Sequence, residues 1–217
     1  MVNNQTLSKT FGWMFIGLLV TFLTGYVVSL NENMLYNIMS TWGMILCIVV
    51  ELGLVIFLSA RITKMQPTTA KISFLLYSFV SGLTFSSIFM VYSLNSIMYV
   101  FLITAVVFAI FAAIGAFTKI DLTKIGSYLL MALLAIIICT IINIFLNSTS
   151  FDLFLSIIII IVFIGFTAYD VQRLKRLSGT GIINEENLAI YGALELYLDF
   201  INLFLELLRL FGSSHDN

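Results

Sequence analysis

Residues 194–211 read LELYLDFINLFLELLRLF, an apolar stretch that carries the carboxyl groups of Glu195, Asp199 and Glu206. The stretch is long enough to cross a bilayer as a helix, but a carboxylate near the bilayer centre costs about 2.5 to 3.5 kcal/mol even on insertion scales. On a helix that turns by about 100° per residue, the polar side chains fall on one stripe roughly 80° wide. This face must contact protein or water instead of lipid. The stripe comprises Tyr191, Glu195, Asp199, Asn202, Glu206 and Arg209.

The composition of the whole chain agrees with a membrane protein. Of its 217 residues, 61% are hydrophobic and only 10% are charged, and the mean hydropathy is +1.11. A soluble globule of this size would need more polar surface. A net charge of -1 without a long basic cluster gives no electrostatic footprint for nucleic acid. We therefore expect an all-α integral membrane protein that binds no nucleic acid.

Seven apolar runs can each cross the hydrocarbon core, which is about 30 Å thick, as a helix. The first run is longer than the roughly 7 to 15 residues of a cleavable signal core, so we expect it to be retained. We predict a single domain of residues 1–217, in which the acidic seventh helix is central and wrapped by the other six. The predicted spans are 11–30, 41–60, 72–93, 97–117, 125–146, 153–171 and 188–211.

Basic residues lie on one side of this alternating path. The loops near residues 31–39, 94–96 and 147–152 contain no Lys or Arg. The positive-inside rule then predicts a cytoplasmic N-terminus and, if the seventh span crosses fully, a C-terminus outside. The basic residues on the predicted cytoplasmic side are Lys9, Arg61, Lys64, Lys71, Lys119, Lys124, Arg173, Lys175 and Arg176.

Asp170 ends the sixth predicted span, and Arg61 ends the second on the same side. Asp170 is either a solvated carboxylate at a helix end or an acid that faces the bundle, where it would meet Asp199 and Arg61. Two carboxyl groups in close contact cannot both ionise cheaply, so they would titrate as a unit and form a proton-controlled latch. Asp199 lies about 16 Å past Leu188 at 1.5 Å per residue. Contact therefore requires the seventh helix to begin further out or the sixth to run deep.

Other acids allow structural interpretations beside functional ones. Glu51, midway through the second span, is either a protonated acid bonded to a Ser or Thr of a neighbouring helix or an acid that lines an ion path. Glu206 and Arg209 are three residues apart and form a local pair. Glu185 and Glu186, in the connection SGTGIINEEN, are expected to be solvated.

The inventory of side chains argues against an enzyme. A serine–histidine dyad or a zinc motif needs a His within a span, and the single His is His215 in the tail. A retinal protein needs a Lys in the seventh helix, and residues 188–211 contain none. An intramembrane aspartyl protease needs a G-x-G-D motif, whereas Leu196, Tyr197 and Leu198 precede Asp199. We expect no catalytic residue and no cofactor. Cys47 and Cys139 are expected to be free thiols.

Three segments resemble the transmembrane Bax inhibitor motif family, in particular its bacterial members: LYLDFINLFLELLRLFG at 196–212, AYDVQRLK at 168–175 and SGLTFSSIF at 81–89. The likeness extends over nearly the whole chain. It implies seven helices with a central seventh and a pH-sensitive calcium leak across a membrane, here a bacterial plasma membrane. The lipid bilayer, calcium and protons would be its partners, with calcium as transported ion.

The resemblance also implies roles for individual residues. Asp170 and Asp199 correspond to the two aspartates of the pH latch, Arg61 to their basic partner and Glu51 to the acid of the second helix. The two aspartates and Glu51 are then the candidate calcium contacts. Glu195 and Glu206 depart from the family pattern, where smaller or apolar residues are expected. The predicted ion pathway comprises Glu51, Glu195, Asn202 and Glu206.

Two alternatives have different consequences. One is a regulatory membrane protein that binds a membrane protease or another membrane partner and moves no ion. The other is a proton-coupled calcium transporter, in which a proton gradient would drive calcium uphill.

Overall fold

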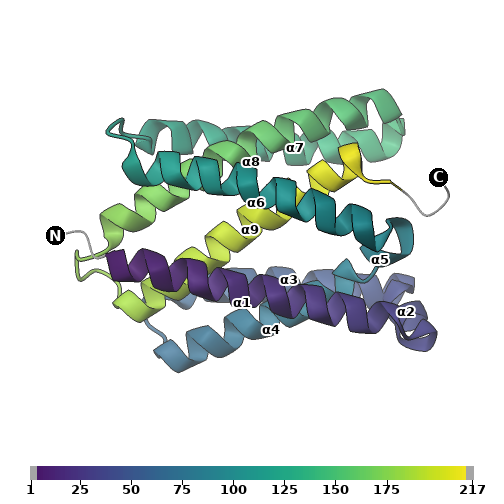
Figure 1. The fold of residues 1–217 in the computed structure, drawn as a ribbon, viewed down its shortest axis with the longest axis horizontal. Coiled ribbons are helices and arrows are strands. Elements are labelled where there is room, and N and C mark those ends of the chain that lie inside the picture. Colours follow the sequence, from purple (N-terminus) through teal and green to yellow (C-terminus); the bar gives the residue numbers. More distant parts are fainter. Residues whose placement is uncertain (1–3, 214–217) are drawn as a thin grey trace. The chain divides into compact units, whose positions relative to one another are not determined.

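The computed structural model describes residues 4–213, and the two chain ends, including His215, lie outside this range. Residues 4–213 form nine helices and no strand, and the helices are labelled in Figure 1. The helices are α1 (Asn4–Ser29), α2 (Glu32–Met39), α3 (Thr41–Arg61), α4 (Pro67–Phe85), α5 (Ile88–Val91), α6 (Leu94–Phe117), α7 (Thr123–Leu146), α8 (Thr149–Leu177) and α9 (Glu185–Phe211).

Seven helical segments of the described chain are long and apolar enough to cross a membrane, which confirms the predicted all-α membrane fold. The predicted spans differ from them mainly at their ends. α1 begins at Asn4 instead of residue 11, and α8 continues to Leu177 instead of ending at residue 171. Pro67 opens α4 in the first helical turn, where its missing N–H costs no hydrogen bond.

The third predicted span is interrupted. α4 ends at Phe85 and α5 begins at Ile88. Between them, the hydroxyl of Ser86 donates to the carbonyl of Leu83 at 2.6 Å, and that of Ser87 donates to the carbonyl of Thr84 at 2.8 Å. Serine side chains that bond nearby backbone offer an alternative to helical hydrogen bonds, which accounts for a break at this Ser-Ser pair.

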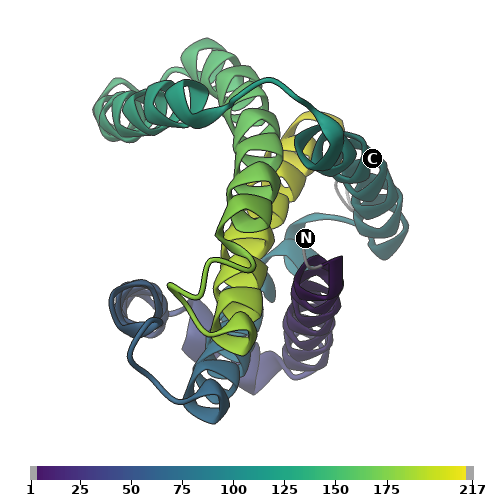
Figure 2. The same ribbon diagram turned by 90° about the vertical axis from the view of Figure 1, so that its left-hand side faces the viewer.

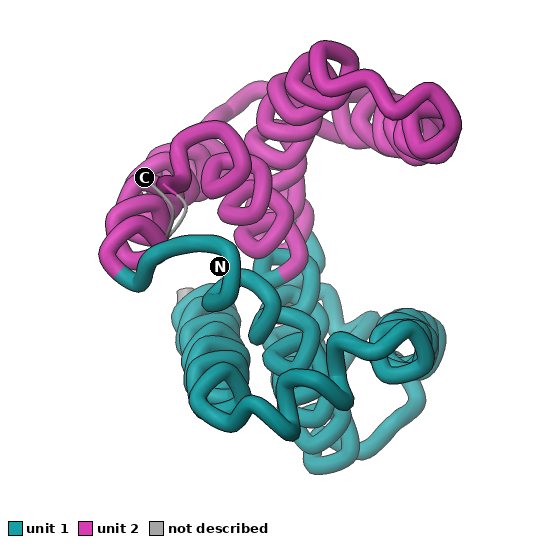
Figure 3. Tube along the Cα trace, turned by 90° about the vertical axis from the view of Figure 1, so that its right-hand side faces the viewer, with its two compact units in different colours: residues 1–94, 176–197, 214–217 teal, residues 95–175, 198–213 magenta. Residues whose placement is uncertain are grey.

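The chain divides into two compact units, coloured separately in Figure 3. Unit 1 comprises residues 1–94, 176–197 and 214–217, and unit 2 comprises residues 95–175 and 198–213. Each unit therefore contains one part of α9, and each is described by itself below. That residues 1–217 act as a single domain stays a prediction.

In unit 1, α4 lies between α1 and α3, and α1 and α4 pack closely (Figure 2). Glycines allow this approach. A Cβ atom at Gly17 of α1 would lie 2.6 Å from the ring of Phe74, and one at Gly82 of α4 would lie 2.6 Å from Thr24. The short helix α2 packs against α1 and α3.

In unit 2, α8 packs on α6 and α7, again at glycines. A Cβ at Gly115 of α6 would overlap the backbone of Ala168, and one at Gly126 of α7 would overlap the ring of Tyr169. Residues 198–211 of α9 contact α6 through aromatic rings, with the centroids of Phe101 and Phe200 5.1 Å apart. Gly115, which lies in the fourth predicted span, thus serves helix packing.

α9 is the most buried of the seven candidate spans. In its apolar 18-residue window 72% of the residues are buried, against 11% in α3 and in α7. Its mean hydropathy of 1.5 is also the lowest of the seven. The least apolar helix is therefore the one best shielded from lipid, as the cost of intramembrane carboxylates requires.

Candidate functional site

Asp170 and Asp199, the two aspartates of the predicted latch, both belong to unit 2 and both are buried. Asp170 is 7% exposed and Asp199 is 4% exposed, and each interacts with other groups of the protein. The interpretation of Asp170 as a solvated carboxylate at a helix end is wrong, because α8 continues to Leu177 and the side chain of Asp170 is buried. A buried carboxyl group has to be paired, hydrogen-bonded or protonated. Contact between the two aspartates stays a prediction.

The surroundings of Asp170 explain its burial. Ala168 and Tyr169, the two residues before it, are covered by Gly115 of α6 and Gly126 of α7, where any Cβ atom would overlap them. The absence of two side chains thus lets two helices approach the segment that carries Asp170. A carboxyl group held in so tight an interior has little freedom to reorient towards water.

The end of α8 beyond Asp170 is fixed to the connection between α6 and α7. Gln172 Nε2 donates to the carbonyl of Ile120 at 2.7 Å, and Gln172 Oε1 accepts from the backbone N–H of Leu122 at 2.9 Å. Lys175 Nζ donates to the carbonyl of Ala116 at 2.6 Å, close to the negative end of the α6 dipole. These contacts join the last turns of α8 to the C-terminal end of α6 and to the connection that follows it.

The other end of unit 2 carries a charged cluster around Arg209. Arg209 Nη2 pairs with Asp152 at the start of α8, and Arg209 Nη1 lies 3.9 Å from Glu206 Oε2. Asn143 Nδ2 of α7 donates to Asp152 Oδ1 at 3.2 Å. The predicted pair of Glu206 and Arg209 is therefore confirmed at long distance, and Asp152 is a closer partner that sequence spacing did not indicate.

The remaining polar residues of the α9 stripe are half-buried. Glu195, in unit 1, interacts with other groups. Asn202 donates from Nδ2 to the carbonyl of Leu198 on its own helix, at 2.7 Å. This bond satisfies one amide proton locally and leaves the amide oxygen available. Their place in an ion pathway, with Glu206 and Glu51, stays a prediction.

Glu51 of α3 lies in unit 1, and its carboxyl group meets a hydroxyl. Thr84 Oγ1 of α4 lies 2.9 Å from Glu51 Oε1 and 2.8 Å from the carbonyl oxygen of Ser81. One hydroxyl proton cannot serve both acceptors fully, whereas a protonated Glu51 that donates to Thr84 would satisfy all three groups. The contact with Thr84 agrees with the structural interpretation of Glu51, in which the acid is bonded to a Ser or Thr of a neighbouring helix. Arg61, at the end of the same helix, is exposed.

Of the two acids predicted to be solvated, Glu186 is exposed, as predicted, and pairs with Lys71 at 2.8 Å. Glu185 is half-buried. Its Oε1 accepts the backbone N–H of Gly179 at 2.7 Å, and its Oε2 accepts the hydroxyl of Ser178 at 3.1 Å and that of Thr6. The prediction for Glu185 was wrong because the first turn of α9 returns towards α1, a pairing that local composition does not indicate.

The described residues contain no group of three or more His, Cys, Asp or Glu side chains arranged to hold a metal ion. Asp170, Asp199 and Glu51, the candidate calcium contacts, thus do not form one such group. A passing cation differs from a resident one, because it needs sites weak enough to leave. Their contact with calcium stays a prediction.

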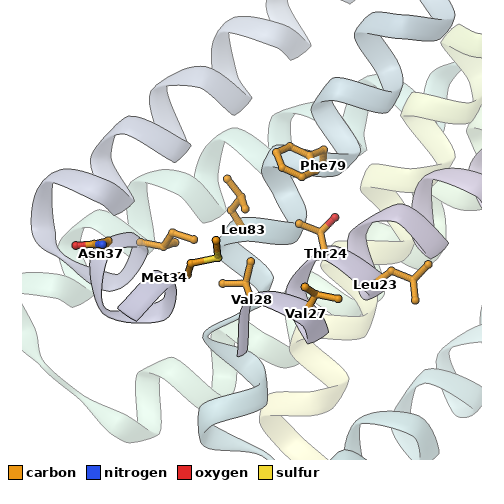
Figure 4. Close-up of a pocket in the computed structure, with 9 residues that line it drawn as sticks. Leu23, Thr24, Val27, Val28, Met34, Asn37, Phe79 and Leu83 are labelled. Atoms are coloured by element: carbon orange, nitrogen blue, oxygen red, sulfur yellow. The ribbon is translucent and has the colours of Figure 1, made fainter. Parts of the chain in front are cut away.

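One cavity of about 620 Å³ lies in unit 1 among α1, α2 and α4 (Figure 4). Its lining contains none of the acids discussed above, and Thr24 and Asn37 are its polar residues. A mainly apolar groove between membrane-spanning helices suits hydrocarbon and offers a cation no carboxylate ligand. The lining residues are Leu23, Thr24, Val27, Val28, Met34, Asn37, Ile38, Phe79 and Leu83.

Four polar side chains near the predicted site residues were missed by sequence reasoning: Thr21, Thr84, Asp152 and Tyr197. Thr84 bonds Glu51, Asp152 pairs with Arg209, and Thr21 and Tyr197 bond each other. A hydroxyl within an apolar span was the available signal, since burial obliges it to find a partner. Which partner it finds depends on contacts between distant helices.

Comparison with known proteins gives the same family over the whole length. The family model described as "Inhibitor of apoptosis-promoting Bax1" matches residues 3–216. The chain is 41% identical to the inner membrane protein YbhL of Escherichia coli K12 over 212 residues, which cover 95% of this chain and 91% of that protein. It is 41% identical to a Borreliella burgdorferi protein over 226 residues, 100% of this chain and 95% of the relative. A Deinococcus radiodurans protein is 34% identical, with 97% and 90% covered.

These matches agree with the seven apolar helices. On sequence and fold together, this integral membrane protein belongs to the Bax inhibitor-1 family.

Proposed function

We propose that this protein is a pH-sensitive, calcium-permeable leak channel of a bacterial plasma membrane. Protonation of the pair Asp170 and Asp199 gates it, and Arg61 competes as partner for whichever aspartate is charged. The observation that carries the proposal is that both aspartates are buried, at 7% and 4% exposure, within apolar helices. Carboxyl groups within membrane-spanning helices cost free energy, so such residues are functional-site candidates by default.

The chemistry of the proposed gate follows from burial. Two carboxyl groups near each other in an apolar interior share a proton in one state and need a counter-charge when both ionise. A change in proton occupancy thus changes which contacts of α8 and α9 are favourable. Hard oxygen ligands suit calcium, and the half-buried acids Glu51, Glu195 and Glu206 with Asn202 supply them along the proposed pathway.

The proposed orientation follows from the basic loops, with the N-terminus in the cytoplasm and the C-terminus outside. The proposal includes no catalytic step and no resident cofactor. Calcium is the transported ion, and the bilayer and protons are the other partners.

Calcium influx into proteoliposomes loaded with a calcium dye, measured at several pH values, tests the proposal. Asp170→Asn and Asp199→Asn each fix one position in a neutral form. Both variants should lose most of the dependence of influx on pH. The matched control is Glu32→Gln, the same loss of charge at an exposed acid of α2, which should retain the wild-type profile.

Three outcomes separate this proposal from its alternatives. Influx that depends on pH equally in the wild type and both Asn variants would contradict gating by protonation of Asp170 and Asp199. A wild-type protein that moves no calcium but co-purifies with one membrane protein would favour the regulatory role. Uphill calcium movement driven by a proton gradient would indicate coupled transport instead of a leak.

A further inference from the structure

Tyr197 is the largest fully buried side chain of α9. It is 0% exposed, and its ring is held edge-on by two rings of α4. The ring centroid of Phe74 lies 6.0 Å away at an interplanar angle of 88°, and that of Tyr77 lies 5.6 Å away at 79°. A ring enclosed in this way can neither rotate nor slide without displacing its neighbours.

The Tyr197 hydroxyl is anchored as firmly as its ring. Tyr197 Oη lies 2.7 Å from Thr21 Oγ1 of α1. Thr21 Oγ1 also lies 3.0 Å from the carbonyl oxygen of Gly17 and 2.9 Å from that of Ser78. Carbonyls only accept, so the single Thr21 proton is directed to them and Tyr197 must be the donor to Thr21.

Both groups of this hydrogen bond are buried. Thr21 is 1% exposed and Tyr197 is 0% exposed, so water offers no replacement partner to either hydroxyl when the bond is lost.

The helices that hold the bond between Tyr197 and Thr21 are themselves closely packed. α1 and α4 approach each other at Gly17 and Gly82, where added Cβ atoms would lie within 3.0 Å of Phe74, Ser78 or Thr24. Thr21 lies between these contacts in sequence. The acceptor for Tyr197 therefore comes from a pair of helices with little room to adjust.

The part of α9 that follows Tyr197 is held differently. Phe200 and Phe204 contact Phe101 of α6 at centroid distances of 5.1 and 6.1 Å, and Phe200 contacts Phe108 at 5.5 Å. Ring contacts of this kind tolerate small shifts, because they are less directional than a buried hydrogen bond. Within one turn, α9 thus passes from a directional hydrogen bond at Tyr197 to less directional ring contacts at Phe200.

We propose that Tyr197 is a positioning residue that fixes the rotation and depth of α9 and thereby sets where Asp199 stands. Asp199 lies two positions further along the helix than Tyr197, which corresponds to about 3 Å of rise and about 200° of rotation. Tyr197 and Asp199 therefore lie on different faces of α9. The hydrogen bond to Thr21 fixes the rotation of the helix at one face, and this rotation determines where the Asp199 side chain points on the other. Its consequence for calcium rests on the proposed function, whereas its consequence for the helix does not.

Tyr197→Phe and Thr21→Val remove the two sides of this bond with little change in shape, and Thr21→Ser retains the hydroxyl. Backbone hydrogen exchange of residues 198–208, read by mass spectrometry, should become roughly fivefold faster in the first two variants, as expected for one buried hydrogen bond. The double variant should exchange no faster than the faster single, and Thr21→Ser should match the wild type. Tyr77→Phe is the matched control, since it removes a hydroxyl from a ring that packs on Tyr197 without touching the bond between Tyr197 and Thr21.

Calcium leak at neutral pH is the second readout, and it should rise roughly fivefold in Tyr197→Phe and Thr21→Val. Wild-type exchange of 198–208 in both variants would overturn the proposal. So would faster exchange spread evenly over α1, α4 and α9, which indicates general destabilisation, or an unchanged leak in variants of a wild type that does leak. If the wild type moves no calcium but exchange rises only in 198–208, the positioning role stands and the channel proposal fails.

Discussion

α7 and α9 are both long enough to span a membrane, but their surroundings are opposite. α7 has a mean hydropathy of 2.9 and 11% of its window is buried, whereas α9 has a mean hydropathy of 1.5 and 72% is buried. In a soluble protein the more apolar helix would be the interior one. Here lipid solvates the apolar helix, and the protein interior receives the acids and hydroxyls that lipid cannot solvate.

The largest expected difference between the two helices comes from removing a tyrosine from each. Tyr197 of α9 is 0% exposed and Tyr128 of α7 is 66% exposed. Tyr197→Ala should lower the free energy of unfolding by about 3 to 5 kcal/mol, because it opens a cavity. Tyr128→Ala should change it by no more than about 0.5 kcal/mol.

Reversible unfolding in mixed micelles, followed by circular dichroism, compares the two tyrosine variants directly. Equal losses in both would mean that the burial contrast between α7 and α9 does not describe the protein in its membrane-like environment.

A smaller difference is expected between two glycines, one at an interior contact and one facing outward. A Cβ at Gly115 of α6 would overlap Ala168, and a Cβ at Gly53 of α3 would have no neighbour within 4 Å. Gly115→Ala should destabilise by about 1 to 3 kcal/mol through overpacking. Gly53→Ala should be neutral or stabilise by up to about 1 kcal/mol, since alanine favours helix.

The same unfolding measurement serves for the glycine pair, with the yield of monodisperse protein as a second reading. A stable Gly115→Ala protein would show that α6 and α8 separate readily near Asp170. The tight interior described for that aspartate would then not hold.

The smallest of the three differences concerns two neighbouring acids at the start of α9. Glu185 accepts from Gly179, Ser178 and Thr6, whereas Glu186 makes one exposed pair with Lys71. Glu185→Gln should cost about 1 to 2 kcal/mol, since it weakens several charge-assisted hydrogen bonds. Glu186→Gln should have little effect, because exposed pairs contribute little.

Hydrogen exchange of residues 178–184 reports on Glu185 locally. It should accelerate in Glu185→Gln and remain at the wild-type rate in Glu186→Gln. If both variants exchange alike, the connection is as solvated as its composition suggests, and the hydrogen bonds of Glu185 do not order it.

The high share of buried residues in α9 agrees with the predicted inward-facing acidic stripe, because a carboxyl group in a span excludes lipid contact on that face. Its central position among the other six helices stays a prediction. Hydropathy placed the seven spans to within several residues, because a helix that crosses the hydrocarbon core needs an apolar run of matching length. Their ends were less predictable, since α1 and α8 continue beyond the apolar core into polar turns.

What could not be predicted depends on which helices meet. Tyr197 and Thr21 are 176 residues apart, and Arg209 and Asp152 are 57 apart. Periodicity within one helix specifies a face but not the residue opposite it. The break at Ser86 and the short helix α2 were missed because each is shorter than the window that detects a span.

The pH response of calcium influx in the Asp199→Asn protein tests the central claim most directly. In proteoliposomes, the wild type should change its influx severalfold between mildly acidic and neutral pH, and Asp199→Asn should show nearly the same influx at both. An Asp199→Asn protein that retains the full wild-type response, at equal reconstitution, would contradict the claim that this buried carboxyl group gates the channel.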